Sequence, residues 1–269
     1  MKLDVYKINA FTTKISGGNP ACVIPLKHWL EDALLQSISK KNAFPETAFF
    51  ILKNDNILLR WFTPEIEMDL CGHATIATAH CLNTILNHPH KLIRFQTKSG
   101  EISVDFNDNK YQMDLPKRVP IKSDLPKLIY KSLNLQPLEV YKSRDYLLIY
   151  KSEEEIKKIK INTHYFNQIN LDPGGVVVTA KGANSDFVSR YFTPQSTILE
   201  DPATGSSHCS LIPFWSKKLN KNHLKSIQLS QRGGKFECIN NSDRVTVIGS
   251  AVTDSQTTIT RTYYNKNKK

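Results

Sequence analysis

Three titratable residues stand where they could transfer protons. Glu46 comes just before an apolar, strand-like segment at residues 47–52. His73 directly follows Gly72, and Asp201 lies shortly before a second glycine turn. A carboxylate beside apolar side chains holds a proton longer than one in water, which suits a general acid or base. The alternative for Glu46 is an ordinary charge at a strand edge facing water, and composition alone favours that alternative.

Two glycines, Gly72 and Gly205, each precede a segment with the pattern of a long helix. The first N–H groups of a helix have no intrahelical partner, and the helix dipole adds partial positive charge there. Two such helix starts facing one cleft would suit a carboxylate ligand and the charge that develops on an enolate. Either glycine alone is explained as an ordinary tight turn, but the pair favours the binding interpretation.

These residues belong to a unit that occurs twice in the chain. Residues 60–64 read Arg-Trp-Phe-Thr-Pro, and residues 190–194 read Arg-Tyr-Phe-Thr-Pro. If the second copy carries three extra residues, Gly72 falls opposite Gly205. A match of five residues is weak by itself, but the predicted elements around it repeat in the same order, which predicts two similar halves.

Hydrophobic periodicity predicts the elements that position these residues. In the first half, we expect helices at 30–40 and 73–87 and strands at 4–11, 21–26, 47–53, 57–62, 91–97, 101–106 and 110–115. In the second half, we expect helices at 124–133, 153–160 and 206–219 and strands at 138–142, 146–150, 175–180, 186–192, 226–231, 235–239 and 244–249. Pro213 should kink or end the last of these helices.

The predicted fold class is α+β, with two pseudo-symmetric lobes that are each a mostly antiparallel sheet wrapped around one long helix. The proline-rich, charged stretch at 114–120 is the expected linker. We therefore assign residues 1–115 to a first lobe and residues 116–249 to a second. The central helices should be apolar nearly all round, so His80 and Cys81 are expected to be core residues.

The composition excludes several classes of protein. Of the 269 residues, 40% are hydrophobic and 23% are charged, which are globular values. No apolar run approaches the ~18 residues of a membrane-spanning helix, and the N-terminal stretch lacks the apolar region of a signal peptide. The net charge is +11, but the basic residues are spread out and form no nucleic-acid motif. We expect a solvated basic surface or an acidic small-molecule partner rather than nucleic acid or a membrane.

The remaining motifs argue against cofactors. The five cysteines are odd in number and lack a Cys-x-x-Cys pair, which predicts a reducing compartment, and we expect the cytoplasm. His88 and His90 have no cysteine or carboxylate at ligand spacing, so no metal site is expected. Glycine-rich nucleotide-binding motifs are absent, so no cofactor is expected. Ser206 lacks the surroundings of a serine-hydrolase nucleophile.

Several motifs, taken together and in order, resemble those of the phenazine-biosynthesis PhzF-like isomerase and epimerase family. They are Gly18-Asn19-Pro20-Ala21, Glu46-Thr47-Ala48-Phe49, the run from Phe62 to Thr75, the run from Glu200 to Cys209, and Gln231-Arg232-Gly233-Gly234. The resemblance implies a fold similar to diaminopimelate epimerase, with the site between two lobes. It also implies that residues 250–269 return to complete the first lobe, and that the protein is a homodimer.

The resemblance further implies a biosynthetic enzyme that isomerises a small carboxylic acid without a cofactor, by proton transfer at carbon. Glu46 would then be the general acid and base, and His73 and Asp201 would orient it or the substrate, or relay protons. The groups implied to hold the substrate carboxylate are the N–H groups of Gly72, Gly205 and Ser206 and the Ser206 hydroxyl. The motifs identify neither the substrate nor a role in phenazine synthesis.

Two alternatives remain open at the level of sequence. Epimerases of the related fold use two cysteines, one from each lobe, but Cys71 has only Thr204 opposite it. We therefore interpret Cys71 as buried packing, with Cys209 one helical turn too far along to serve. The second alternative is a protein on the same scaffold that binds a small acid without catalysis. Such a binder needs only the helix starts, so the presence of Glu46, His73 and Asp201 favours the enzyme.

Overall fold

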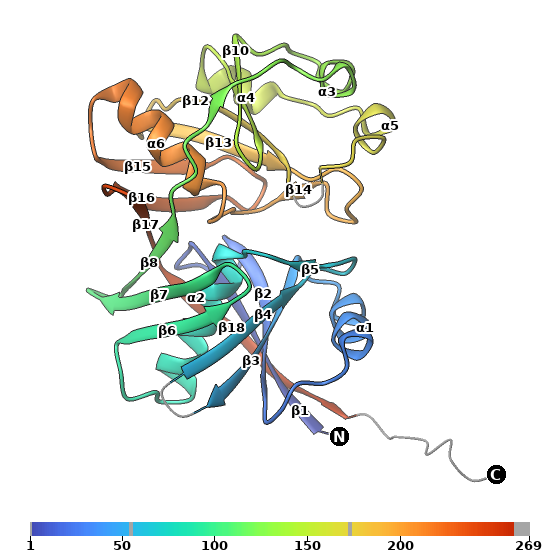
Figure 1. Ribbon diagram of the computed structural model, residues 1–269, viewed down its shortest axis with the longest axis vertical. Coiled ribbons are helices and arrows are strands. Elements are labelled where there is room, and N and C mark those ends of the chain that lie inside the picture. The colour runs from blue at the N-terminus through green and yellow to red at the C-terminus, as the bar shows by residue number, and fades with distance from the viewer. Residues whose placement is uncertain (1, 54–55, 172–173, 261–269) are drawn as a thin grey trace, which may run out of the picture.

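The computed structural model describes residues 2–53, 56–171 and 174–260. Figure 1 shows the elements of residues 2–116 in the lower part of the view, together with the C-terminal strand (Ala251–Thr260), and those of residues 121–249 in the upper part. The elements of the first half are β1 (Lys2–Ala10), β2 (Asn19–Leu26), α1 (Asp32–Asn42), β3 (Glu46–Lys53), β4 (Asn56–Phe62), β5 (Glu67–Met68), α2 (Gly72–His80), the π-helical turn η1 (Cys81–Ile85), β6 (Leu92–Thr97), β7 (Gly100–Asn107) and β8 (Lys110–Pro116).

The second half follows the same order with small additions. Its elements are β9 (Ile121–Lys122), α3 (Lys127–Ser132), β10 (Glu139–Lys142), β11 (Tyr146–Ile149), α4 (Glu153–Lys158), α5 (Thr163–Phe166), β12 (Val176–Lys181), β13 (Phe187–Phe192), β14 (Glu200–Asp201), α6 (His208–Leu219), β15 (His223–Gln228), β16 (Gly234–Asn240), β17 (Arg244–Gly249) and β18 (Ala251–Thr260). The expected strands and helices are present, whereas α5 and the two-residue strands β5, β9 and β14 were not predicted.

Strand pairing repeats between the halves. In the first half β2 pairs with β3 in parallel, β3 with β4 antiparallel, and β4 with β6 in parallel. In the second half β11 pairs with β12 in parallel, β12 with β13 antiparallel, and β13 with β15 in parallel. Both series then continue as antiparallel ladders, β6–β7–β8 and β15–β16–β17. The internal repeat in the sequence therefore corresponds to a repeat of hydrogen-bonded topology.

The strands form one sheet, not the two that the sequence suggested. The antiparallel pair β8–β17 joins the two series, so all 18 described strands are connected. Strand β9 pairs with β10 within the second half, whereas the long β18 crosses to the first half and pairs along β1, with Ile259 opposite Leu3. The C-terminal segment thus returns to the first half as far as residue 260, and the rest of the expected 250–269 segment, 261–269, lies outside the described residues.

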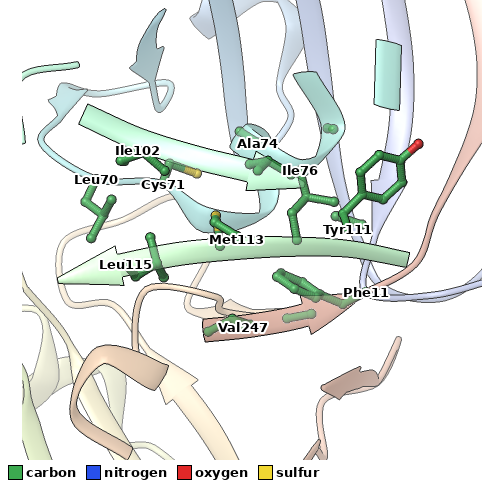
Figure 2. Packing of buried hydrophobic residues seen from close by; sticks show 14 of the residues in the cluster. Phe11, Leu70, Cys71, Ala74, Ile76, Ile102, Tyr111, Met113, Leu115 and Val247 are labelled. Atoms are coloured by element: carbon green, nitrogen blue, oxygen red, sulfur yellow. The ribbon is translucent and has the colours of Figure 1, made fainter. Parts of the chain in front are cut away.

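The core surrounds helix α2, whose nine residues are all buried. Figure 2 shows Ala74 and Ile76 of this helix beside Met113 of β8, with Val247 of β17 in the same cluster. His80 and Cys81 are buried there, as expected from the apolar pattern. The α-helix is shorter than the expected 73–87, because after His80 the chain continues as one π-helical turn.

Helix α6 continues past Pro213 to Leu219, so the chain does not end its helix at the proline. A proline inside a helix removes one N–H donor and leaves the carbonyl four residues earlier without a partner. Here that carbonyl belongs to Cys209, and it accepts a hydrogen bond from the backbone N–H of Arg118 at 2.9 Å. The linker between the halves therefore satisfies the group that Pro213 leaves free, and the helix continues to Leu219.

No described helix combines the length and the apolar character that crossing a membrane would require.

All five cysteines lie within the described residues, and each is buried and unpaired.

Candidate active site

Glu46 and His73 meet in the interior where β3 and α2 begin. Glu46 is the first residue of β3, and its side chain is 14% exposed, whereas the His73 side chain is 3% exposed. His73 Nε2 lies 3.0 Å from Glu46 Oε2. The atoms are within ion-pair distance, but their alignment does not make a hydrogen bond, and neither atom has another hydrogen-bond partner among the described residues. Both buried atoms therefore keep unused hydrogen-bonding capacity.

The other nitrogen of His73 faces Asn19. Asn19 Nδ2 lies 2.9 Å from His73 Nδ1, and the same amide nitrogen donates to Asp201 Oδ1 at 2.7 Å and to the Ala203 carbonyl at 2.9 Å. The amide nitrogen has two hydrogens, and these two acceptors take both, so it donates to Nδ1 only by giving up one of them. A protonated ring carries a hydrogen on Nδ1 and on Nε2, and in that state an N–H group is on the side of Glu46.

Electrostatics favours the charged form of His73. Burial lowers its pKa, but the charges of Cys71 and Glu46 outweigh this effect and raise the pKa well above its ordinary value. Cys71 Sγ is 3.6 Å from His73 Nδ1. The Cys71 thiol itself stays protonated near neutral pH, because burial raises its pKa to about 11. The contact with Glu46 is therefore the one that acts on His73 at neutral pH.

Asp201 reaches the same cluster from the second half of the chain. It lies in β14, accepts from Asn19 through Oδ1, and accepts from the Thr204 hydroxyl through Oδ2. Burial raises the pKa of Asp201, His73 lowers it, and Glu46 raises it, with a net increase. Gln228 holds this turn, because its Nε2 donates to the Asp201 carbonyl at 2.6 Å and its Oε1 accepts from Thr204 N at 2.8 Å. Asn19 and Asp201 thus connect the two halves at His73.

The two predicted helix starts are in contact. A Cβ atom added to Gly72 would lie 2.9 Å from Gly205 Cα, and one added to Gly205 would lie 3.1 Å from Gly72 Cα. Helix α2 begins at Gly72, whereas α6 begins at His208 after a turn in which His208 N donates to the Gly205 carbonyl. Only residues without a side chain allow two backbones to approach this closely. Each glycine therefore has a structural reason, and the pair brings the start of α2 against the turn that leads into α6.

A pocket of about 240 Å³ lies over these groups. The six predicted site residues, Glu46, Gly72, His73, Asp201, Gly205 and Ser206, all line it. This volume suits a compact small molecule. The sequence assigned no role to Asn19, although the Gly-Asn-Pro-Ala motif contains it. Arg144, which lines the pocket, was not predicted from the sequence. No repeated motif contains Arg144, so the sequence offered no signal that would have identified it.

The pocket does not contain two paired thiols. Cys71 lines it and is 4% exposed, but Cys209 is fully buried and is not among the lining residues that the structure describes. Burial raises the pKa of each of these thiols to about 11. Thiolates are the reactive form, and neither cysteine supplies one near neutral pH. The geometry fits the interpretation of Cys71 as a packed residue beside His73.

One group of possible metal ligands occurs among the described residues. Glu46, Cys71 and His73 each offer one ligand atom, and the three atoms lie within 4.8 Å of one another. Cys71 approaches Nδ1 of the ring, whereas Glu46 lies at Nε2. One ion takes one ring nitrogen, so the two flanking residues address opposite sides of the imidazole. This arrangement suits proton exchange with the ring better than a shared ion.

Comparison with known proteins gives consistent results. The family model described as phenazine biosynthesis-like protein matches residues 8–257. A Pseudomonas aeruginosa protein named as an uncharacterized isomerase is 39% identical over 253 residues, which are 94% of this chain and 96% of that protein. The crystal structure of a phenazine biosynthesis protein of the PhzF family from Enterococcus faecalis has a TM-score of 0.89 at 37% identity, covering 97% of this chain and 100% of that chain.

The fold extends to more distant proteins. A probable proline racemase from Agrobacterium radiobacter has a TM-score of 0.67 at 9% identity, covering 98% of this chain and 94% of that chain, which shows a common epimerase-like fold. The match of the family model over most of the chain and the near-complete coverage of the relatives agree with the motifs at Glu46, Gly72 and Asp201. The chain therefore belongs to the PhzF-like isomerase family of phenazine biosynthesis-like proteins.

Proposed function

We propose that the protein isomerises a small carboxylic acid by moving a proton from one carbon to another, without a cofactor. The observation that carries this proposal is the contact between Glu46 and His73 in a pocket lined by both helix starts. A proton donor and acceptor beside a site for negative charge is the arrangement that such a reaction needs. The basic net charge of +11 also suits an anionic substrate.

In this mechanism the Glu46 carboxylate removes a proton from a carbon of the substrate. The electron pair of the broken C–H bond moves toward the substrate carboxylate as an enolate or its extended equivalent, and the N–H groups near Gly72 and Gly205 stabilise that charge. Protonated Glu46 then returns the proton to a different carbon. His73 orients Glu46 through their ion-pair contact, and Asp201 with Asn19 holds the ring of His73 in place.

The scaffold would comprise two pseudo-symmetric lobes, with the substrate between them. We assign residues 1–115 and the returning strand β18 to the first lobe and residues 116–249 to the second. The repeated order of strand pairings supports this division, as does the pairing of β18 with β1 of the first half. Each helix start would then be contributed by a different lobe.

We further propose that the protein acts as a homodimer in the cytoplasm. Four large apolar side chains that are at least half exposed fall within residues 119–138, namely Val119, Ile121, Tyr130 and Leu138. Exposed apolar side chains gathered in one stretch are typical of contact surfaces. Light scattering should give twice the chain mass of 30.6 kDa, and a mass of one chain at micromolar concentrations would contradict the dimer.

The test of the proposed function begins with a ligand. A screen of small carboxylic acids for thermal stabilisation identifies compounds that bind, because a ligand of the folded state raises its stability. Each compound is then incubated with the enzyme in heavy water, and deuterium uptake at carbon is followed by NMR. The wild type should incorporate deuterium into its substrate, whereas Glu46→Gln should bind the acid and lose about 10²–10⁴-fold in exchange rate.

Glu65→Gln is the matched control, because Glu65 lines the same pocket but is exposed. This variant should retain most of the exchange. Binding without exchange by the wild type would indicate the non-catalytic alternative. Near-full exchange by Glu46→Gln would show that another group is the base, with His73 the next candidate.

A further inference from the structure

The pocket holds one guanidinium that the proposed proton transfer does not use. Arg144 lies in the loop between β10 and β11, and its side chain is 11% exposed. Among the lining residues that the structure describes, it is the one lysine or arginine, and the others include the three carboxylates Glu46, Glu65 and Asp201. A buried arginine in an otherwise acidic small-molecule pocket calls for a functional reason.

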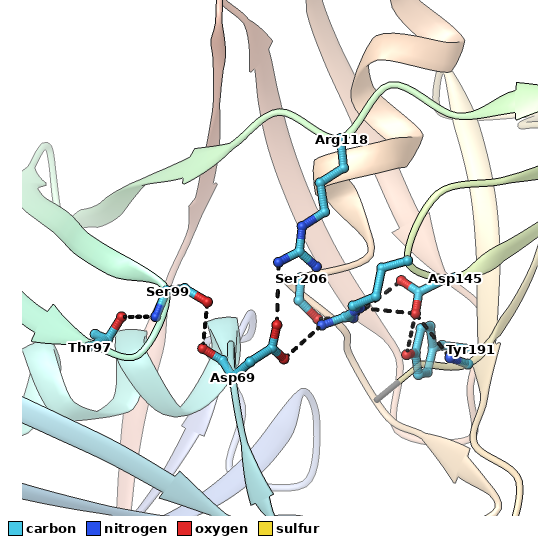
Figure 3. Close-up of polar contacts among 9 residues, drawn as sticks. Asp69, Thr97, Ser99, Arg118, Asp145, Tyr191 and Ser206 are labelled. Carbon is cyan, nitrogen blue, oxygen red and sulfur yellow. Dashed lines mark hydrogen bonds and ion pairs between the residues drawn. The ribbon is translucent and has the colours of Figure 1, made fainter. Parts of the chain in front are cut away.

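Arg144 is held in a fixed orientation by Asp145. Its Nε and Nη2 each lie 3.2 Å from one oxygen of the Asp145 carboxylate, which is a two-point contact. Asp145 is 3% exposed and also accepts from Gly175 N at 2.9 Å and from the Tyr191 hydroxyl at 3.0 Å. Figure 3 shows Asp145 beside Tyr191 and Ser206. The guanidinium is therefore preorganised before any ligand arrives.

The free edge of the guanidinium and the Ser206 hydroxyl provide two donors. Arg144 Nη2 donates to Ser206 Oγ at 3.2 Å, and since arginine only donates, the hydroxyl hydrogen of Ser206 remains for another acceptor. Arg144 Nη1 is buried and makes no hydrogen bond among the described residues. It lies 3.5 Å from Asp69 Oδ1 in an ion pair, and Asp69 also contacts Arg118 through Oδ2 at 3.4 Å. Figure 3 shows Asp69 with Arg118 in this network.

We propose that Arg144 Nη1 and the Ser206 hydroxyl together bind the carboxylate of the substrate. This inference rests on the proposed function, since it names the group that holds the acid while Glu46 acts. The charges permit it: Arg118 and Arg144 balance Asp69 and Asp145, so the network is neutral before the ligand binds. The N-termini of α2, at Gly72, and of α6, at His208 shortly after Gly205, each add about half a positive charge, and together they offset one carboxylate.

The proposed anchor specifies a class of substrate. Both oxygens of a planar carboxylate can accept, one from the guanidinium edge and one from the adjacent hydroxyl. A neutral amide of the same shape has an NH₂ group in place of one oxygen, so a donor would face a donor there. The pocket should therefore accept small acids and reject the corresponding amides. Since Ser206 is next to Gly205, an acid bound there also contacts the helix start that stabilises the developing charge.

The test measures binding and does not depend on turnover. Benzoate and crotonate are titrated into the full-length protein by NMR up to tens of millimolar, with benzamide and crotonamide as neutral counterparts. The wild type should bind at least one acid and prefer it to its amide. Arg144→Gln should weaken that binding by about 10–100-fold, which is the size of a charge-assisted hydrogen bond.

Arg118→Gln is the matched control, because it removes the same charge beside Asp69 but does not line the pocket. Because Arg118 belongs to the same charge network, its loss should also weaken acid binding, but clearly less than Arg144→Gln does. Arg144→Lys keeps a charge beside Asp145 but cannot reproduce the fork, and it should also weaken binding. If Arg144→Gln fails to fold, Arg144→Lys decides the matter.

Unchanged acid binding in folded Arg144→Gln or Arg144→Lys would overturn the anchor, as would equal losses in the Arg118 control. Failure of the wild type to bind either acid, or to prefer an acid to its amide, would overturn it too. A different result would contradict the proposed function alone. If acid binding depends on Arg144 but no bound acid exchanges deuterium, Arg144 still anchors the acid, and the protein is not an isomerase of that acid.

Discussion

Replacing Gly72 by alanine tests whether the two helix starts must touch for the site to work. The added Cβ would lie 2.9 Å from Gly205 Cα, 3.1 Å from Gly205 C and 3.0 Å from Met113 Cε. Met113 Cε is the end of a flexible side chain and can move, whereas the Gly205 backbone cannot. Ordinary contact needs about 3.4–4 Å, so the helix starts must separate by roughly 0.5–1 Å.

This displacement sets the expected size of the effect. Overpacking of a well-packed interior costs about 1–3 kcal/mol, which for a chain of this size lowers the melting temperature by roughly 2–12 °C. A shift of about 1 Å in groups that position a substrate can cost about 10²-fold in rate. We therefore expect Gly72→Ala to remain folded at 25 °C, to melt earlier, and to lose about two orders of magnitude in deuterium exchange.

Thermal unfolding and solvent exchange measure the two effects on the same sample. Met113→Leu conserves volume and should by itself cost less than about 1.5 kcal/mol with near-normal exchange. Combined with Gly72→Ala, it should restore neither property, because the contact with Gly205 remains. A Gly72→Ala protein with wild-type melting and wild-type exchange would refute the view that close contact between the helix starts builds the site.

Two further predictions concern Asn19 and His208. Asn19→Ala removes the donor at His73 Nδ1 and leaves the acceptors of Asp201 and Ala203 unpaired, which should cost about 1–3 kcal/mol and turnover as well. Nitrogen-15 NMR of the His73 ring should then change, and unchanged ring shifts would contradict the assigned role. Burial lowers the pKa of His208 to about 4, so the folded protein binds fewer protons than the unfolded chain between about pH 4 and 6.5. The resulting contribution to the free energy of unfolding is fully present above pH 6.5 and falls by about 2–3 kcal/mol at pH 4.5. Urea unfolding should show this loss in the wild type and a smaller loss in His208→Gln. Equal losses in the two proteins would exclude His208 as the source.

The sequence was informative where the chemistry is local and less so where it depends on distant partners. The repeat around Phe62 and Phe192 predicted the order of elements, because each strand and helix carries its own pattern. The joining of both halves through β8 and β17 was not predictable, since periodicity does not say which strands pair. The uninterrupted course of α6 past Pro213 depends on the N–H of Arg118, a residue 95 positions earlier in the chain.

The site residues were likewise predictable where the signal is local in the sequence. Glu46, His73 and Asp201 were expected from their positions next to turns, and the pocket contains all three. Asn19 bonds to both His73 and Asp201, but an asparagine before a proline reads as a turn residue in sequence alone. Arg144 and Asp145 are adjacent charges that would ordinarily be assigned to the surface, and only the fold shows that they are buried.

The repeat also explains why one scaffold with two similar halves would carry a single base. Thr47 pairs with Phe62 in the first half, and Val176 pairs with Phe192 in the second, so Gly175 occupies the position that corresponds to Glu46. A Cβ atom on Gly175 would lie 2.5 Å from the Tyr191 ring, so no acid or base fits there. A racemase that inverts one carbon needs a proton donor and a proton acceptor on opposite faces of that carbon. A pocket with Glu46 on one side and no counterpart at Gly175 favours a reaction in which one base takes a proton and returns it to another carbon, which is an isomerisation rather than an inversion.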